Sequence, residues 1–297
     1  MRDTLKRLVP DKIRQRMNKN LPDQNTPETE LNANYLLAHL YTPLINPNEK
    51  KKTFSFDYKK STALPYKNDP FPLPSPELRM GYAPDNDEEY HQSGVKSSDT
   101  IRKILQEQKI IMDENTTAMD WGCATGRSLR HFWKEAQKGE FWGLEQDAPA
   151  TKWNKENLSP PFHFLTCSAY PHLPFHDDKF TFVYGLSVFT HIVHFQDLWL
   201  MEFQRILKKN ACAIFTIHDE STWDYCQKNL TTPWLPDIDV SKGLEHDILI
   251  CQGHDWASTI TFYRTEWIRK EWNQYLEVVD IKPMAEGYQT AIVLRKK

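Results

Sequence analysis

From about residue 95 onward, strand-like and helix-like segments alternate along this 297-residue chain. Alternation with helices of about 10–15 residues predicts crossover units, and hence a mostly parallel sheet covered by helices on both faces, an α/β fold. The expected strands are residues 117–121, 141–145, 163–167, 180–186, 211–218, 276–281 and 289–295, and the expected helices are residues 101–110, 128–138, 148–157, 197–208 and 265–275.

The first 85 residues have a different composition. Of 19 prolines, 11 fall at or before Pro84, and no glycine or tryptophan precedes Gly81. The proline-rich stretch 69–76 favours extended, polyproline-like backbone over helix or central strand. We therefore expect an N-terminal helical and extended arm, residues 1–85, followed by a compact domain, residues 86–297.

Within the arm, apolar side chains recur every fourth residue from Leu5 to Leu21, which is helical spacing. Seven bases and two acids accompany this stripe and give residues 1–20 a local charge of +5. Such a helix fits either an anionic membrane surface or the protein's own domain. The stripe has little bulk and no aromatic side chain, which favours the second interpretation.

Composition excludes several classes of protein. With 37 bases against 40 acids the net charge is −3, which argues against a chain that coats nucleic acid with a basic face. No uncharged apolar run approaches the roughly 18 residues that a membrane-spanning helix needs. Five cysteines without a CxxC pair, and no apolar segment behind the basic start, favour a reducing compartment. We expect a soluble, cytoplasmic protein with no transmembrane segment.

In parallel sheets, ligands bind beyond the carboxyl ends of the strands, where the strand order reverses. The sharpest motif lies at such an end: Asp120 closes the first expected strand, and Gly122 and Gly126 follow in a loop before a helix. Glycines permit positive φ and close backbone approach, and a helix start offers free amides to an anion. The spacing fits neither the dinucleotide fingerprint G-x-G-x-x-G nor a P-loop, because Ala124 replaces a glycine and no Lys-Ser or Lys-Thr follows.

The sequence DWGCATG at 120–126 resembles the D-x-G-C-G-x-G loop of class I S-adenosylmethionine-dependent methyltransferases. Further segments resemble motifs of the same family in the same order. They are FWGLE at 141–145, LPFHDDKFTFV at 173–183, SVFTHI at 187–192, LMEFQRILKK at 200–209 and the closing hairpin strand at 287–296. The resemblance covers residues from about 90 to 297 and implies a Rossmann-like, doubly wound sheet of seven strands with an antiparallel C-terminal strand.

The resemblance also implies the cofactor, S-adenosylmethionine, and the residues that bind it. The loop residues would cradle the methionine part, and the carboxylate of Glu145, with Gln146 beside it, would take both ribose hydroxyls. The complete expected set is Asp120, Gly122, Cys123, Ala124, Gly126, Glu145, Gln146, Ser168, Ala169, Leu186, Ser187 and Val188. The third-strand acid that often meets adenine is missing, since only Ser168 there has a hydrogen-bonding side chain.

Two histidines at strand ends are candidates for a general base, which would assist transfer to a hydroxyl if its pKa lay near 7. His218 precedes Asp219, which could orient it, and His191 follows the fourth strand. The competing interpretations are a polar cap for His218 and a brace beneath the cofactor for His191.

Other features have both a functional and a structural interpretation. The pairs His191/His194 and His172/His176 have helical ligand spacing, but a zinc site needs about four ligands, so we expect no metal. Tryptophans 223, 234, 256, 267 and 272 would recognise a sugar or another flat ligand, or would simply pack the core. The segment 90–94, before the first expected helix, would serve as a lid over the cofactor.

The leading hypothesis is a methyltransferase that acts on a small-molecule or glycan hydroxyl. A non-catalytic, cofactor-binding scaffold with the same fold is the alternative. Nicotinamide-dependent oxidoreduction is disfavoured by the glycine spacing. A nucleic-acid acceptor is not expected, because the main domain has no basic stripe.

Overall fold

The computed structural model describes residues 62–192, 194–229, 243–251 and 259–297, all within the compact unit Phe56–Lys297. The predicted helical stripe at residues 5–21 and most of the predicted arm lie outside the described residues. No described helix is both long and apolar enough to cross a membrane.

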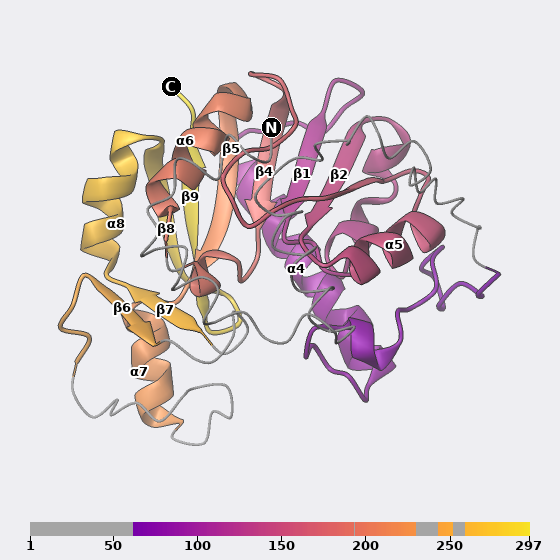
Figure 1. Ribbon diagram of the computed structural model, residues 1–297, viewed down its shortest axis with the longest axis horizontal. Helices are drawn as coiled ribbons and strands as arrows, with labels where there is room; N and C mark the ends of the chain where they lie inside the picture. Colours follow the sequence, from indigo (N-terminus) through magenta and orange to yellow (C-terminus); the bar gives the residue numbers. More distant parts are fainter. Residues whose placement is uncertain (1–61, 193, 230–242, 252–258) are drawn as a thin grey trace, which may run out of the picture. The chain divides into compact units, whose positions relative to one another are not determined.

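The described residues form a seven-stranded sheet with the order β3-β2-β1-β4-β5-β9-β8 (Figure 1). β1 to β5 run parallel, whereas β9 pairs antiparallel with both β5 and the edge strand β8. The order reverses between β1 and β4, so that this pair marks the switch point of the sheet. The strands are β1 (Thr117–Trp121), β2 (Glu140–Glu145), β3 (His163–Thr166), β4 (Phe180–Gly185), β5 (Leu207–Ile217), β8 (Glu277–Glu286) and β9 (Gln289–Arg295). The predicted doubly wound α/β fold is confirmed.

Side chains that alternate along β1 enter two separate cores. Met119 and Trp121 face helices α6 (Gln196–Ile206) and α8 (Thr265–Glu271), whereas Ala118 faces helix α4 (Asp87–Glu107). Trp121 is the centre of the first core, with ring centroids of Trp199, Phe203, Phe189 and Phe215 at 4.6, 4.9, 5.3 and 5.8 Å. Burial on both faces is the reason that these strands are apolar almost throughout.

Three predicted helices differ from the observed ones, and one of them, 265–275, is divided into α8 and the 3-10 turn η5 (Trp272–Gln274). α4 begins at Asp87 rather than near residue 101, because the Asn86 side chain caps it by accepting from the Glu89 amide. The predicted helix 128–138 is instead two short 3-10 turns, η2 (Leu129–Phe132) and η3 (Glu135–Gln137). Here the His131 carbonyl accepts from the Arg102 guanidinium at 2.6 Å, which competes with a helical hydrogen bond.

The segment after β5 contains elements that the sequence pattern does not predict. Helix α7 (Glu220–Lys228) follows β5, with Asp219 in a capping box at its start. β6 (Ile248–Cys251) and β7 (Ile260–Tyr263) form a separate antiparallel pair. The remaining described elements are η1 (Pro76–Leu78), α5 (Ala148–Asn157) and η4 (Phe189–His191).

The described end of the predicted arm is fastened to the domain by a fully buried arginine. Arg130 is 0 % exposed, and its Nε donates to Asp69 Oδ2 at 2.6 Å. Its Nη2 donates to the carbonyls of Phe71 and Pro72, both at 2.8 Å. The Phe71 side chain enters the core on the α4 face. Residues 69–72 are therefore part of the packed domain surface, and the predicted boundary at residue 85 stays a prediction.

We expect Asp69→Asn to destabilise the protein by about 3–5 kcal/mol, because the buried Arg130 charge loses its anionic partner. Urea unfolding followed by circular dichroism measures the change. Asp177→Asn is the matched control, since Asp177 forms an exposed ion pair with Arg205 and should cost about 1 kcal/mol or less. Equal losses in the two variants would show that the buried pair has no special role.

Candidate functional site

The loop after β1, residues 122–126, turns sharply because three of its residues have positive φ. Gly122 lies at +74°, Ala124 at +47° and Gly126 at +69°. A Cβ on Gly122 would lie 2.5 Å from Val188 Cγ2, and one on Gly126 would lie 2.6 Å from Leu158 Cδ1. Both glycines are therefore required by backbone conformation and by close packing.

This loop is bonded directly to the end of β2. The amides of Gly122 and Cys123 donate to the Leu144 carbonyl at 2.8 and 2.9 Å, and the Ala124 amide donates to Glu145 Oε2 at 2.7 Å. From α5, Asn154 Nδ2 donates to the Ala124 carbonyl at 2.7 Å. The structure thus brings the predicted glycine loop and the predicted ribose acid into direct contact.

Glu145 accepts further hydrogen bonds from the amides of Gln146 and Asp147, at 2.8 and 3.0 Å, through Oε1. The residue is 8 % exposed, and burial raises the pKa of its carboxyl while the amide hydrogen bonds oppose the rise. A carboxylate has about four acceptor positions, so a diol would take the remaining one or displace an amide. Asp147 itself caps α5 by accepting from the Ala150 amide.

Asp120 lies beneath the loop rather than on its outer surface. It is buried, and its Oδ2 accepts from Ser128 Oγ at 3.0 Å. Burial raises the pKa of its carboxyl to about 7, although the hydrogen bond from Ser128 acts in the opposite direction. Asp120 therefore anchors the loop to the segment that follows it.

The end of β3 lies next to Glu145, because the Cys167 amide donates to the Glu145 carbonyl at 2.9 Å. Ser168 bonds only locally in the described residues, with its Oγ accepting from the Tyr170 amide at 3.2 Å. Ala169 is exposed. These two predicted residues thus follow Cys167, which bonds to Glu145, and neither of them has a charged side chain.

The end of β4 completes the edge of the sheet. Val188 packs against Gly122, and Leu186 packs against the core on the α4 face. Ser187 has a φ of +58°, and its amide donates to Thr216 Oγ1 at 2.7 Å. Val188 therefore lies next to the glycine loop, and Leu186 and Ser187 precede it at the end of β4, beside the switch point.

Gln289 is a buried polar residue that the sequence reasoning missed. Its Oε1 accepts from Thr216 Oγ1 at 2.6 Å, and its Nε2 donates to Ser187 Oγ at 2.9 Å. His218 Nε2 lies 3.4 Å from the same amide nitrogen. The expected antiparallel direction of the last strand could have indicated this position, because it puts the first residue of β9 at the carboxyl edge of the parallel strands.

His218 and His191 have very different surroundings. His218 is 3 % exposed, and burial lowers its pKa to about 3, with the neighbouring His191 acting in the same direction. The Asp219 carboxylate caps α7 by accepting from the amides of Ser221 and Thr222, which is its role here in place of the expected pairing with His218. A ring with such a low pKa is neutral at pH 7 and is a weak base.

His191 is half-buried, and its Nδ1 lies 2.7 Å from the Thr259 carbonyl. A carbonyl only accepts, so Nδ1 must donate, and in the neutral ring Nε2 carries the lone pair. A backbone carbonyl thus orients His191, which lies three residues after Val188.

The predicted lid segment, residues 90–94, lies inside α4 and packs directly on the loop. Tyr90 is buried, and its hydroxyl lies 3.1 Å from Thr125 Oγ1. A Cβ on Gly94 would lie 2.2 Å from the Arg127 carbonyl. The segment therefore forms part of a helix that supports the loop.

Of the five clustered tryptophans, the described ones follow the core interpretation. Trp223 and Trp272 are buried, and Trp267 packs against Tyr263 with ring centroids 6.1 Å apart. Residues 234 and 256 lie outside the described residues.

Among the described residues, one group could offer three ligands to a metal: Asp69, His91 and His131, with ligand atoms within 4.8 Å of one another. Arg130 already occupies Asp69 Oδ2. Burial lowers the pKa of His131 to about 3, and three nearby arginines add to that effect. These charges disfavour a cation, and the absence of a metal site stays a prediction.

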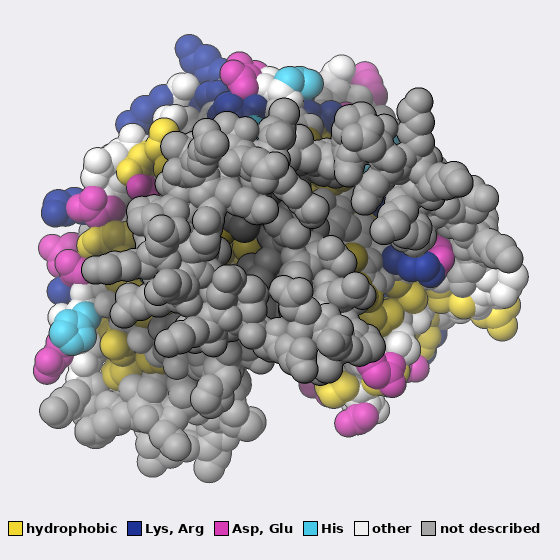
Figure 2. Space-filling view, viewed as in Figure 1, with side chains coloured by type: hydrophobic (Ala, Val, Ile, Leu, Met, Phe, Trp, Pro, Cys, Tyr) yellow, Lys and Arg dark blue, Asp and Glu magenta, His cyan; other side chains and the backbone are white. Residues whose placement is uncertain are grey.

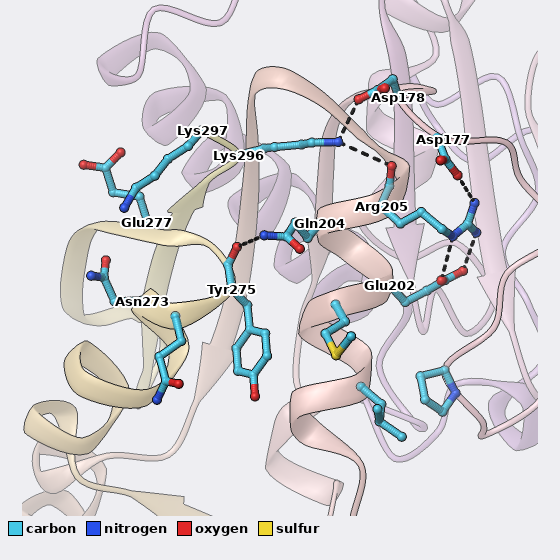
Figure 3. A pocket seen from close by; sticks show the side chains of 14 residues that line it. Asp177, Asp178, Glu202, Gln204, Arg205, Asn273, Tyr275, Glu277, Lys296 and Lys297 are labelled. Atoms are coloured by element: carbon cyan, nitrogen blue, oxygen red, sulfur yellow. Dashed lines mark hydrogen bonds and ion pairs between the residues drawn. The ribbon is translucent and has the colours of Figure 1, made fainter.

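A cleft of about 650 Å³ lies at the opposite edge of the sheet (Figure 3). Asp178 precedes β4 and Lys296 follows the antiparallel β9, so both lie at the amino ends of the parallel strands. Four of the charged side chains in this cleft pair with one another: Lys296 with Asp178 at 2.7 Å, and Arg205 with Glu202 at 2.6 Å. The cleft is therefore separate from the glycine loop.

Comparison with known proteins identifies the fold. Residues 119–215 match the family model of a methyltransferase domain. The PH0226 protein from Pyrococcus horikoshii has a similar structure, with a TM-score of 0.50, 16% identity and coverage of 73% of this chain and 95% of that chain.

Two further structures are similar at lower scores. A SAM dependent methyltransferase from Aquifex aeolicus has a TM-score of 0.45 and 14% identity over 66% of this chain and 89% of that chain. Geranyl diphosphate C-methyltransferase from Streptomyces coelicolor has a TM-score of 0.48 and 13% identity over 74% of this chain and 84% of that chain. No curated protein sequence matches the chain.

The buried Asp120 should make stability depend on pH. Its folded pKa of about 7 lies above its ordinary value of 3.8, so the folded state holds its proton over a range where the unfolded state has lost it. The contribution of Asp120 protonation to the free energy of unfolding is complete below pH 4. This contribution, about 4 kcal/mol, is lost as the pH rises toward 7.

We expect Asp120→Asn to show a shallower fall in stability between pH 4 and 7 than the unsubstituted protein, measured by urea unfolding at a series of pH values. Asp177→Asn, at an exposed site, is the control and should keep the original slope. An unchanged slope in Asp120→Asn would assign the pH dependence to other groups.

Proposed function

We propose that this chain is a class I S-adenosylmethionine-dependent methyltransferase and that it transfers a methyl group to a hydroxyl of a small molecule or glycan. The sheet order and the methyltransferase-domain match over β1 to β5 support the membership. The hydroxyl acceptor is proposed in addition to the methyl transfer itself.

The single observation that carries the proposal is the contact between the Ala124 amide and the Glu145 carboxylate at 2.7 Å. It joins a loop with three positive-φ residues to a buried acid, beside the switch point of the sheet. In this arrangement Glu145 would hold the ribose hydroxyls through charge-assisted hydrogen bonds, and the loop backbone would hold the methionine part.

The bound cofactor supplies a sulfonium methyl with a good leaving group. The chain's own residues have to align a nucleophile about 3 Å from that methyl and keep water out. Leu186, Ser187 and Val188 would line the transfer position. The Gln289 side-chain amide would hold Ser187 and His218 in place through its Nε2 contacts with both. Ser168 and Ala169 would border the adenine of the cofactor. Backbone groups would form the hydrogen bonds to adenine that a third-strand acid often forms.

Of the two histidines, we propose His191 as the general base. The Thr259 carbonyl fixes its Nδ1 as a donor, which directs basicity to Nε2. Burial holds the pKa of His218 near 3, so His218 would instead serve as a neutral hydrogen-bonding group in the Gln289 network.

The alternative is a scaffold that binds the cofactor without turnover, and it would be favoured by binding with no methyl transfer to any acceptor. A nucleic-acid acceptor is less favoured. Where Figure 2 shows described side chains on this face, bases and acids stand beside one another and form no basic stripe. A cytoplasmic location stays part of the proposal.

Calorimetry should detect binding of S-adenosylhomocysteine to the full chain, and Glu145→Ala should weaken it by about 1.5–3 kcal/mol, the range for hydrogen bonds to charged groups. Glu140→Ala is the control on the same strand, because Glu140 is partly exposed and pairs with Lys179. A wild-type chain that ignores the ligand at millimolar concentration would end the proposal.

We expect His191→Ala to lower the rate of labelled-methyl transfer into fractionated lysate by about 10²–10⁴-fold, the usual contribution of general-base catalysis. Affinity for S-adenosylhomocysteine should stay the same. His194→Ala, three residues away and exposed, is the control and should keep its rate. Equal rates in both variants would remove His191 from the mechanism.

A further inference from the structure

A chain of polar contacts runs from the residue after Gly126 to the hairpin between β8 and β9. Arg127 Nη1 donates to Ser97 Oγ at 3.0 Å, and Ser97 Oγ in turn donates to Glu286 Oε1. Ser97 belongs to α4, and Glu286 is the last residue of β8. Three segments that are distant in sequence therefore meet beside the glycine loop.

Tyrosine rings flank this chain of contacts. The Arg127 guanidinium lies 4.3 Å from the centroid of the Tyr82 ring, which is 38 % exposed. Tyr288 lies two residues after Glu286, with its ring centroid 5.8 Å from that of His218. Burial raises the pKa of Tyr288 to about 12, and the nearby Tyr82 phenol adds to the rise. We call Tyr82, Ser97, Arg127, Glu286 and Tyr288 the acceptor cluster.

The acceptor cluster lies at the candidate transfer site. Tyr288 contacts His218, which belongs to the Gln289 network that holds Ser187. Arg127 directly follows the glycine loop. A molecule bound to the cluster would therefore lie between the loop and the hairpin, next to the transfer position.

The cluster has unused hydrogen-bonding capacity of both kinds. Glu286 Oε2 is buried and has no hydrogen-bond partner among the described residues, so that it lacks a donor. Arg127 has five N–H donors, and its described hydrogen bonds to Ser93 and Ser97 both use Nη1. A buried carboxylate oxygen without a donor is costly, and a ligand hydroxyl would supply one.

Charge decides between ligand classes. Aromatic rings with a carboxylate are typical of sites for ammonium groups, but the Arg127 charge would repel a cation here. Arg127 and Glu286 cancel each other, which favours a neutral ligand. Hydroxyls on one ring can donate to Glu286 and accept from Arg127, and tyrosine faces pack well against the flat, C–H-rich face of such a ring.

We propose that the acceptor cluster binds a neutral sugar ring, with vicinal hydroxyls between Glu286 and Arg127, and so selects a carbohydrate as the methyl acceptor. This inference rests on the proposed function, because it presumes that methyl transfer takes place at the neighbouring edge of the sheet.

The test uses the full chain saturated with S-adenosylhomocysteine, and four methyl pyranosides of gluco, galacto, manno and rhamno configuration as probes. Saturation-transfer NMR titration should show binding of at least one probe, and Glu286→Gln should raise its Kd by about tenfold or more. Glu277→Gln, at the other end of β8, is the matched control and should bind as the wild type does.

Thermal unfolding and S-adenosylhomocysteine affinity should be the same in both variants and the wild type, which separates the acceptor cluster from cofactor binding. Binding of S-adenosylhomocysteine without binding of any pyranoside would overturn this inference and leave the proposed function intact. Equal pyranoside affinity in Glu286→Gln and Glu277→Gln, or preferential binding of butylammonium as a cationic probe, would overturn it as well. A wild-type chain that does not bind S-adenosylhomocysteine would overturn the proposed function itself.

Discussion

The hydrogen bond from the Ala124 amide to the Glu145 carboxylate is the contact on which the site depends. It fixes the distance between a loop that leaves β1 and an acid that ends β2, and the parallel pairing of these strands makes it reachable. Gly122 and Gly126 permit the turn, while Leu144 accepts two amides from the same loop. Together with the two amide hydrogen bonds to Leu144, this contact joins the two predicted halves of the site.

The sequence predicted those parts of the molecule whose conformation is local. The central strands are apolar on both faces, which made them recognisable. The predicted helix 148–157 is capped by Asp147, its immediate neighbour in sequence. Helix 128–138 failed because Arg102, distant in sequence, takes the carbonyl of His131. No pattern within 128–138 could have revealed that competition.

The same distinction applies to the site. Residues that touch through neighbouring parallel strands were predicted together, since their positions follow from strand ends. Gln289 was missed because its partners, Thr216 and Ser187, come from two other strands and meet it only when β9 inserts antiparallel beside β5. The low pKa of His218 likewise comes from burial by the surrounding fold.

Burial gives the acids of the site a shared electrostatic character. Burial raises the pKa of both Asp120 and Glu145, and the charge on Glu145 contributes to the rise at Asp120. Two ionised carboxylates that are both buried and close to each other are therefore unfavourable. A cation at the loop would stabilise both ionised acids, so the surroundings favour a positively charged ligand. The acceptor cluster beyond it is neutral overall, and the two neighbouring regions therefore suit molecules of different charge.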